Sequence, residues 1–280
     1  MNIGHRHFPS LVDIRKAHGW KRDYEKYLPI SRFIFRPIGF LLTWVALRIG
    51  LTTESTAWLS GIVGVSGCVF IMSKHTNFIL FGIFLLLFFN LLDCVDGSIA
   101  RVTKTENPYG RFLDSICGGI VDLAFWGVVG VMAFRNEDLL IWPDPCGVNT
   151  LFWLAIGSLT CFLYIFTSFI EKIFKSTLRH HWDQIRTKYR NKLISPRENY
   201  QRPLIEDPDS KARCIVRMLN TNLRVRESHY LLLIISYFTG SIDLLLSIFF
   251  IYYLCQVIIL LAIFSQRGKA VRVSHLEDTI

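Results

Sequence analysis

Three aspartates near the polar ends of two apolar segments have the chemistry of metal ligands. Asp93 and Asp96 follow the apolar residues 77–92 and are spaced i and i+3, so on a helix they lie on one face. Asp114 stands near the start of the next apolar segment. Ionisable groups are expensive inside a membrane segment, which makes them candidates for function. Carboxylates that converge from two helices suit Mg²⁺ when substrate phosphates complete its octahedron.

Small residues and an arginine continue the helical face of the first two aspartates. Gly97 and Ala100 would let a ligand approach the backbone closely, and Arg101 offers a planar guanidinium that suits phosphate. Each feature alone has an ordinary explanation, because acids at the end of a span are usually solvated and small residues usually serve helix packing. Their combination predicts a metal site that binds phosphate.

The elements that position these residues must be membrane helices. The 280-residue chain is 51% hydrophobic and 19% charged with a mean hydropathy of +0.36, whereas about 25% charged residues is usual in globular proteins. Several apolar stretches approach the ~20 residues that a helix needs to cross a bilayer. This composition excludes a disordered chain and a secreted disulfide scaffold. The seven cysteines are scattered without a C-x-x-C pair, so neither a zinc site nor a disulfide framework is expected.

We predict an all-α polytopic membrane protein with six transmembrane helices and an N-terminal interfacial amphipathic helix. The interfacial helix lies between Pro37 and Gly50, because the apolar stretch there is too short to span. Thr52 or Thr53 can cap the first span. The six spans are expected at about 54–72, 77–100, 110–134 and 149–172, and, within the apolar residues 229–265, on either side of a turn at Gly240, Ser241 and Asp243.

The polar regions complete the predicted organisation. Residues 1–32 form a basic cytoplasmic arm, residues 33–265 form one six-helix domain, and residues 266–280 form a cytoplasmic tail. The domain includes a cytoplasmic loop at 175–228. Apolar residues recur at helical spacing over 178–193, which indicates either a basic amphipathic helix against the lipid headgroups or a soluble helix packing on its own loop.

The distribution of positive charge orients the chain. In the six-span arrangement 29 of the 31 lysines and arginines lie on one side, and Lys74 and Arg135 lie on the other. By the positive-inside rule the N-terminus, the C-terminus and the aspartates near that boundary are cytoplasmic. The net charge of +9 is therefore explained by attraction to the lipid bilayer, and we expect no nucleic-acid partner. The first thirty residues are polar and charged, so no cleavable signal peptide is visible.

One segment resembles the signature of the CDP-alcohol phosphatidyltransferase family. The family signature is D-x-x-D-G-x-x-A-R, about eight residues, and G-x-x-x-D-x-x-x-D. Seven of its eight fixed positions match at the right spacing, and the resemblance extends over roughly residues 33–134. The matching segment reads Asp93-Cys-Val-Asp96-Gly97-Ser-Ile-Ala100-Arg101, eight residues, and Gly110-Arg-Phe-Leu-Asp114.

The resemblance implies an enzyme of phospholipid biosynthesis. Such an enzyme moves a phosphatidyl or other substituted phosphate from a CDP-linked lipid donor to an alcohol acceptor and releases CMP. CDP-diacylglycerol is the usual donor, and a sister branch uses CDP-choline or CDP-ethanolamine. The resemblance also implies one or two divalent ions, Mg²⁺ or Mn²⁺, and a homodimer. The family's metal ligands correspond to Asp93, Asp96 and Asp114. Its CDP-binding positions correspond to Asp93, Gly97, Ala100, Arg101 and Gly110.

One position departs from the signature. The family's last aspartate, a general base or second metal ligand, falls at Gly118. The next acid is Asp122, roughly 12 Å along the helix from Asp114, which is too far to share a metal ligand shell directly. Asp122 could contact an acceptor or a water chain, or it could be an interhelical hydrogen-bonding residue. We take Asp114 and Asp122 as the candidate catalytic residues.

Two other functional classes have some support. Gly118 favours a catalytically degenerate relative that binds a nucleotide-lipid or acts as a scaffold, which nucleotide binding without turnover would identify. Intramembrane acids also mark ion paths in transporters. The acids here cluster at one edge and no inverted repeat is apparent, which disfavours transport. Substrate-dependent flux in liposomes would revive that interpretation.

Overall fold

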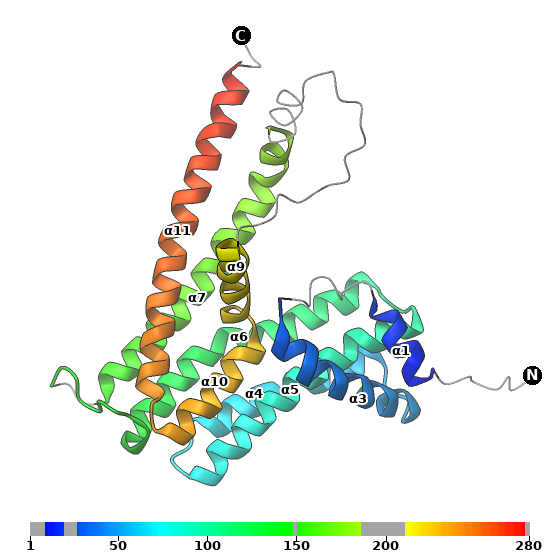
Figure 1. The fold of residues 1–280 in the computed structure, drawn as a ribbon. Helices are drawn as coiled ribbons and strands as arrows, with labels where there is room; N and C mark the ends of the chain where they lie inside the picture. The colour runs from blue at the N-terminus through cyan, green and yellow to red at the C-terminus, as the bar shows by residue number, and fades with distance from the viewer. Residues whose placement is uncertain (1–8, 20–26, 148–149, 186–210, 278–280) are drawn as a thin grey trace, which may run out of the picture.

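The chain folds into a helical bundle (Figure 1). A computed structural model describes residues 9–19, 27–147, 150–185 and 211–277, and within these ranges the chain forms no strand. The prediction of an all-α membrane protein is therefore confirmed. The helices are α1 (Leu11–Ala17), the π-helix η2 (Ser31–Phe35), α3 (Arg36–Arg48), α4 (Thr53–Ile71), α5 (Thr76–Thr103), α6 (Pro108–Arg135), the 3₁₀-helix η3 (Glu137–Leu139), α7 (Leu151–Thr177), α9 (Lys211–Leu223), α10 (Arg226–Thr239) and α11 (Ile242–Glu277).

Five helices of the described residues are long and apolar enough to cross a membrane, namely α4, α5, α6, α7 and α11. The predicted count of six is not confirmed. The expected fifth span is α10, whose 14 residues extend about 21 Å, less than the ~30 Å hydrocarbon core. The helix is short because the turn falls early in the apolar stretch, where Gly240 adopts a left-handed conformation with φ of 63°.

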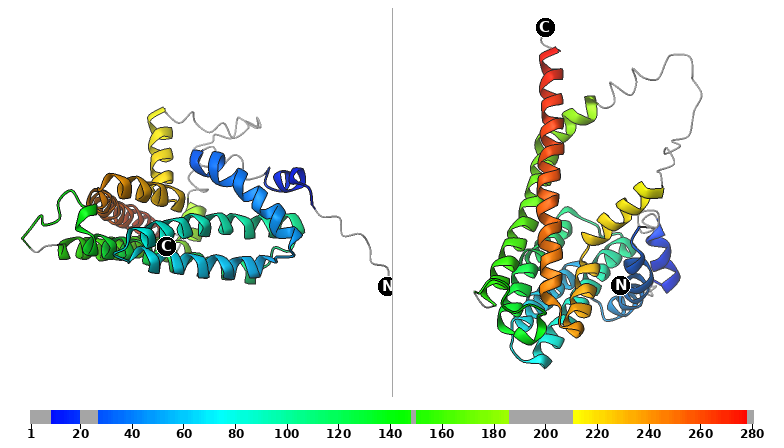
Figure 2. Two further views of the ribbon diagram at one scale, coloured as in Figure 1. Left: turned by 90° about the horizontal axis from the view of Figure 1, so that it is seen from below. Right: turned by 60° about the vertical axis from the view of Figure 1, so that its left-hand side comes forward.

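The last helix is longer than predicted. α11 runs for 36 residues to Glu277, so it does not end at residue 265 and includes most of the expected tail. Since residues 266–277 contain no proline, nothing in their backbone stops the helix. α11 lies beside α7, and both extend beyond the rest of the bundle in two views (Figures 1 and 2).

Local start and stop signals place the helices that carry the aspartates. Thr52 forms a capping box with Ser55 at the start of α4, as the sequence predicts. Asn107 caps α6 by accepting from the Gly110 N–H, and Pro108 occupies the first turn. The connection between α5 and α6 is thus shorter than the expected loop at 101–109.

The polar regions contain structure that the sequence did not reveal. Within the arm expected at 1–32, Ser10 and Asp13 form the capping box of α1, and Ile14 is buried. In the loop expected at 175–228, α7 continues to Thr177, residues 179–185 are helical, and α9 follows at Lys211–Leu223. The rest of the amphipathic helix predicted at 178–193 lies outside the described residues.

Close backbone packing fixes α4 against α5. A Cβ atom at Gly82 would lie 2.7 Å from the Ile71 nitrogen and 2.8 Å from the Gly67 oxygen, so the two backbones are in contact there. Bulky side chains from α5, α6 and α11 fill the core beside this contact, among them Phe89, Trp126 and Phe249. Because the helices cannot slide at such contacts, the residues near their other ends keep a fixed relative position.

Hydrogen bonds tie the helix ends opposite the aspartates. The fully buried Asp243 at the start of α11 accepts from the backbone N–H groups of Ile141 at 3.0 Å and Trp142 at 2.8 Å. Arg135 Nη1 donates to the Met72 carbonyl at 2.7 Å, which joins α6 to the turn after α4. This end of the bundle is therefore a structural anchor for the end that carries the signature.

Candidate functional site

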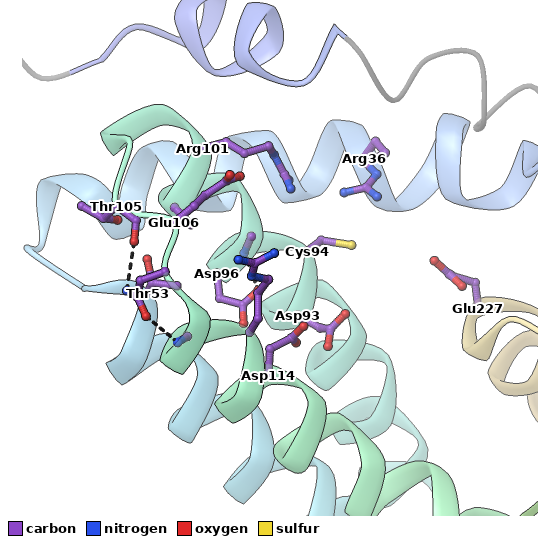
Figure 3. A pocket seen from close by; sticks show the side chains of 15 residues that line it. Arg36, Thr53, Asp93, Cys94, Asp96, Arg101, Thr105, Glu106, Asp114 and Glu227 are labelled. Atoms are coloured by element: carbon purple, nitrogen blue, oxygen red, sulfur yellow. Dashed lines mark hydrogen bonds between the residues drawn. The ribbon is translucent and has the colours of Figure 1, made fainter. Parts of the chain in front are cut away.

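A cavity of about 420 Å³ lies where the C-terminal part of α5 meets the start of α6. Arg36 of α3 and Glu227 of α10 form further parts of its wall (Figure 3). The structure brings together every signature residue that the sequence singled out except the substituted position 118. The lining residues from that set are Asp93, Asp96, Gly97, Ala100, Arg101, Gly110 and Asp114.

Two helices supply the three aspartates of this cavity. Asp93 and Asp96 are one turn apart on α5 and both line it, as their spacing predicts. Asp96 is 3% exposed and accepts a short hydrogen bond from the Gly97 N–H. Asp114 enters from the second turn of α6, whose first turn is held by the Asn107 cap at 2.7 Å. Figure 3 shows the three carboxylates grouped together.

The donor set fits a divalent cation in its chemistry. The buried Asp96 carboxylate interacts electrostatically with Asp93 and Asp114, which are like charges that Arg101 offsets in part. A buried carboxylate beside like charges is costly unless a cation compensates it, and oxygen ligands suit Mg²⁺. Among the described residues, however, no three His, Cys, Asp or Glu side chains are close enough to form a ready metal cage. Further ligands, such as substrate phosphate oxygens, would have to complete it.

Three arginines line the same cavity as the aspartates. They are Arg36, Arg101 and Arg111. Arg101 folds back along α5, where its Nη2 donates to Ser98 Oγ at 3.3 Å. A Cβ atom at Gly97 would lie 3.3 Å from Arg101 Nη1, so a glycine at 97 leaves room for the Arg101 guanidinium. The cavity thus offers acids for a cation and guanidinium groups for an anion, as a metal-bound diphosphate requires.

Arg226, the first residue of α10, engages two of the acidic residues. Its Nη1 lies 2.9 Å from Asp93 Oδ1, and its Nε lies 2.8 Å from Asp122 Oδ1 and 3.0 Å from Asp122 Oδ2. The guanidinium also lies over the Phe89 ring, 5.2 Å from its centroid. A Cβ atom at Gly118 would lie 2.6 Å from Arg226 Nη2. Arg226 therefore fills the space beside the departure from the signature.

The same ion-paired residues line a second cavity of about 280 Å³. It shares Asp93 and Glu227 with the first cavity. Asp122 lines the second cavity and is absent from the lining of the first, in agreement with its predicted distance from Asp114. Its wall consists of Asn90, Asp93, Asp122, Tyr164, Arg224, Val225, Arg226, Glu227 and His229.

The sequence did not single out Arg36, Arg226 or Glu227 as site residues. In the sequence Arg36 directly precedes the apolar stretch that begins at Pro37, and Arg226 lies near the end of the polar loop at 175–228. In the sequence each of them is a charged residue at the start of an apolar helix. Such a residue can be a site residue, but it is more usually a solvated residue at a helix end. Only the packing of α3 and α10 against α5 distinguishes the two meanings.

Comparison with known proteins identifies relatives of the part that forms the site. Residues 55–185 match the family model described as CDP-alcohol phosphatidyltransferase. A phosphatidylinositol phosphate synthase from Mycobacterium marinum is 31% identical over 113 residues, which is 40% of this chain and 47% of that protein. Its counterpart from Mycobacterium bovis is 28% identical over 135 residues, which is 48% of this chain and 59% of that protein.

These matches cover about half the length of the curated relatives. The family-model match at residues 55–185 covers nearly all of α4 and the whole of α5, α6 and α7, and thus includes both motif helices. This family-model match excludes α3 and α10, which supply Arg36, Arg226 and Glu227 to the two cavities.

Proposed function

We propose that this chain is a member of the CDP-alcohol phosphatidyltransferase family, whose model its residues 55–185 match, and that it is an integral-membrane transferase of phospholipid biosynthesis. It would move a phosphatidyl or related group from a CDP-alcohol, with CDP-diacylglycerol as the preferred donor, to an alcohol and release CMP. The observation that carries this proposal is the convergence of Asp93, Asp96 and Asp114 with Arg101 on one cavity.

The first cavity is the proposed donor site. The diphosphate of the donor would lie between the aspartates and the guanidinium groups of Arg36 and Arg101, which line the same space. Gly97, Ala100 and Gly110 give that wall little side-chain bulk, so the nucleotide can approach the backbone closely. A cavity formed at the ends of apolar helices leaves the lipid chains of a donor next to the bilayer.

Asp93, Asp96 and Asp114 would hold one divalent ion, Mg²⁺ or Mn²⁺. When bound, such an ion neutralises the charge of the diphosphate and of the departing CMP. Asp93 uses Oδ1 to accept from Arg226, and its second oxygen can serve the ion. The family is generally dependent on divalent metals, which agrees with this assignment.

The second cavity is the proposed acceptor site, because it adjoins the first at Asp93 and Glu227. The acceptor hydroxyl oxygen would form a bond to the donor's lipid-linked phosphorus while the phosphorus–oxygen bond to CMP breaks. Asp114 would take the hydroxyl proton. Arg226 Nε contacts both oxygens of Asp122, so we assign Asp122 the task of holding Arg226 and the acceptor rather than the proton.

The surroundings of the site follow as further proposals. The lipid bilayer surrounds α4 to α7 and α11, and the positive-inside rule places both termini and the site on the cytoplasmic side. We keep residues 33–265 as the catalytic domain, with helix α1 of the arm packed on α3 and α5. A homodimer, expected from the resemblance, stays a prediction.

A catalytically degenerate relative remains the second candidate function. Gly118 replaces a signature aspartate, and Arg226 already neutralises part of the Asp93 carboxylate. Such a protein would bind the nucleotide-lipid and not turn it over.

The decisive assay is CMP release by the purified chain in lipid-detergent micelles. CDP-diacylglycerol is tested with several alcohols, including an inositol phosphate because the mycobacterial relatives are named for phosphatidylinositol phosphate. CDP-choline and CDP-ethanolamine are tested with diacylglycerol. We expect CMP with Mg²⁺ and none with EDTA. Donor binding without CMP from any pair would identify the degenerate relative, and no binding at all would refute both functions.

A further inference from the structure

We infer that Arg226 is a resident cation of the site, held between Asp93 and Asp122 where it excludes a divalent ion. The inference deepens the proposed function and rests on it for the location of the reaction. The metal binding that it predicts depends only on residues of this chain and not on turnover. It predicts a site that takes one divalent ion and one guanidinium.

The contacts of Arg226 are those of a fixed group. Nη1 is bound to Asp93 of α5 and Nε to Asp122 of α6, at 2.9 and 2.8 Å. The guanidinium also lies over the aromatic face of Phe89, which favours a cation. The side chains of Arg226, Asp93 and Asp122 are 25%, 27% and 19% exposed. Ion pairs with so little exposure are screened far less by water and salt than surface pairs.

Gly118 makes this arrangement possible. It lies on α6 one turn before Asp122, and any Cβ atom there would lie 2.6 Å from Nη2 and 3.3 Å from Cζ of Arg226. Such distances are too short for a carbon atom, so a larger residue at 118 would move the guanidinium. The neighbouring Gly119 has nothing within 4 Å of its would-be Cβ atom. A Cβ atom at 118 would therefore displace the Arg226 guanidinium, whereas one at 119 would meet no neighbour.

Two carboxylates that share one cation are themselves a pair of hard oxygen ligands. Because Asp93 and Asp122 both contact the same guanidinium, a divalent ion could bind both only after Arg226 has left. The guanidinium also lines the second cavity next to the shared wall residues Asp93 and Glu227. A permanent positive charge is thus placed at the junction of the proposed donor and acceptor sites.

The test counts Mn²⁺ ions bound per chain by equilibrium dialysis of the purified full chain, without any substrate. Arg226→Gln removes the charge and is expected to bind one more Mn²⁺ than the wild-type chain. Arg224→Gln is the matched control, because it removes the same charge two residues before Arg226. The Arg224 side chain pairs with Glu171 at 2.5 Å. No gain is expected there. Arg226→Gln combined with Asp122→Asn should lose the gain, since one carboxylate is missing.

An unchanged Mn²⁺ count in Arg226→Gln would overturn the inference, and so would an equal gain in Arg224→Gln. If Arg226→Gln does not fold, Gly118→Ala is compared with Gly119→Ala. Gly118→Ala is expected to tighten Mn²⁺ binding severalfold by displacing the guanidinium, and superimposable titrations would again overturn the inference. These results do not depend on CMP release, so a failure of the proposed enzymatic function is recognised separately.

Discussion

Replacement of Asp96 by asparagine is expected to lower the rate of CMP release by about 10²- to 10³-fold, the usual effect of removing a preorganised charge contact. Asp96 is the most enclosed acid of the donor cavity, at 3% exposed, and it faces Asp93 and Asp114. Asparagine has nearly the same shape and can still accept from the Gly97 N–H. The substitution therefore removes the charge that a divalent ion needs while it keeps the packing.

The measurement is kcat with saturating donor and Mg²⁺, together with the thermal midpoint of the purified variant. Asp138→Asn provides a matched control, because Asp138 is an exposed acid in η3, outside the cavity lining. It should leave kcat unchanged. A folded Asp96→Asn variant with more than a third of the wild-type rate would show that the aspartate cavity is not where the reaction occurs.

Replacement of Gly157 by alanine is expected to destabilise the bundle by about 1–3 kcal/mol, the typical cost of overpacking a filled core. Gly157 of α7 and Gly130 of α6 meet backbone to backbone, and a Cβ atom at 157 would lie 2.9 Å from the Gly130 nitrogen and 3.0 Å from the Trp126 oxygen. Neither backbone can swing away as a side chain can, so the two helices must separate.

Thermal unfolding in detergent measures this effect, with an expected drop in Tm of about 2–4 °C per kcal/mol. Gly127→Ala, on the facing helix α6, is the control, because its would-be Cβ atom meets only Cys161 Sγ at 4.0 Å. Its Tm should stay within about 1 °C of the wild type. Equal midpoints for the two variants would mean that α6 and α7 are not packed as described.

The helical fold could be predicted from the sequence because apolar length and capping residues are local signals. Thr52, Gly50 and Gly240 act where the sequence places them, as a cap and as two positive-φ stops. The span count was less certain because it depends on where a turn divides a long apolar stretch. The turn lies at Gly240, where the sequence places it, and it leaves α10 short and α11 long; the predicted count of six treated the residues before this turn as a full span although they are too few to cross the hydrocarbon core.

The grouping of the signature residues around one cavity could be predicted because they lie in one contiguous motif on two adjacent helices. Asp93, Asp96 and Asp114 meet because α5 and α6 are joined by a short capped turn. Arg226 lies more than a hundred residues away from its partner Asp122, and its position depends on α10 packing against α5. In the sequence Gly118 is the loss of a signature aspartate, whereas in the structure the Arg226 guanidinium fills the space beside it.

The most direct test locates the metal and the nucleotide together. Crystals of the full chain grown with CDP-diacylglycerol and Mn²⁺ would give an anomalous signal from the ion. We expect a single peak in the 420 Å³ cavity, about 2.1 Å from oxygens of Asp93, Asp96 and Asp114 and bound to the donor's diphosphate. Nucleotide density outside that cavity, or Mn²⁺ bound away from these aspartates, would contradict the account.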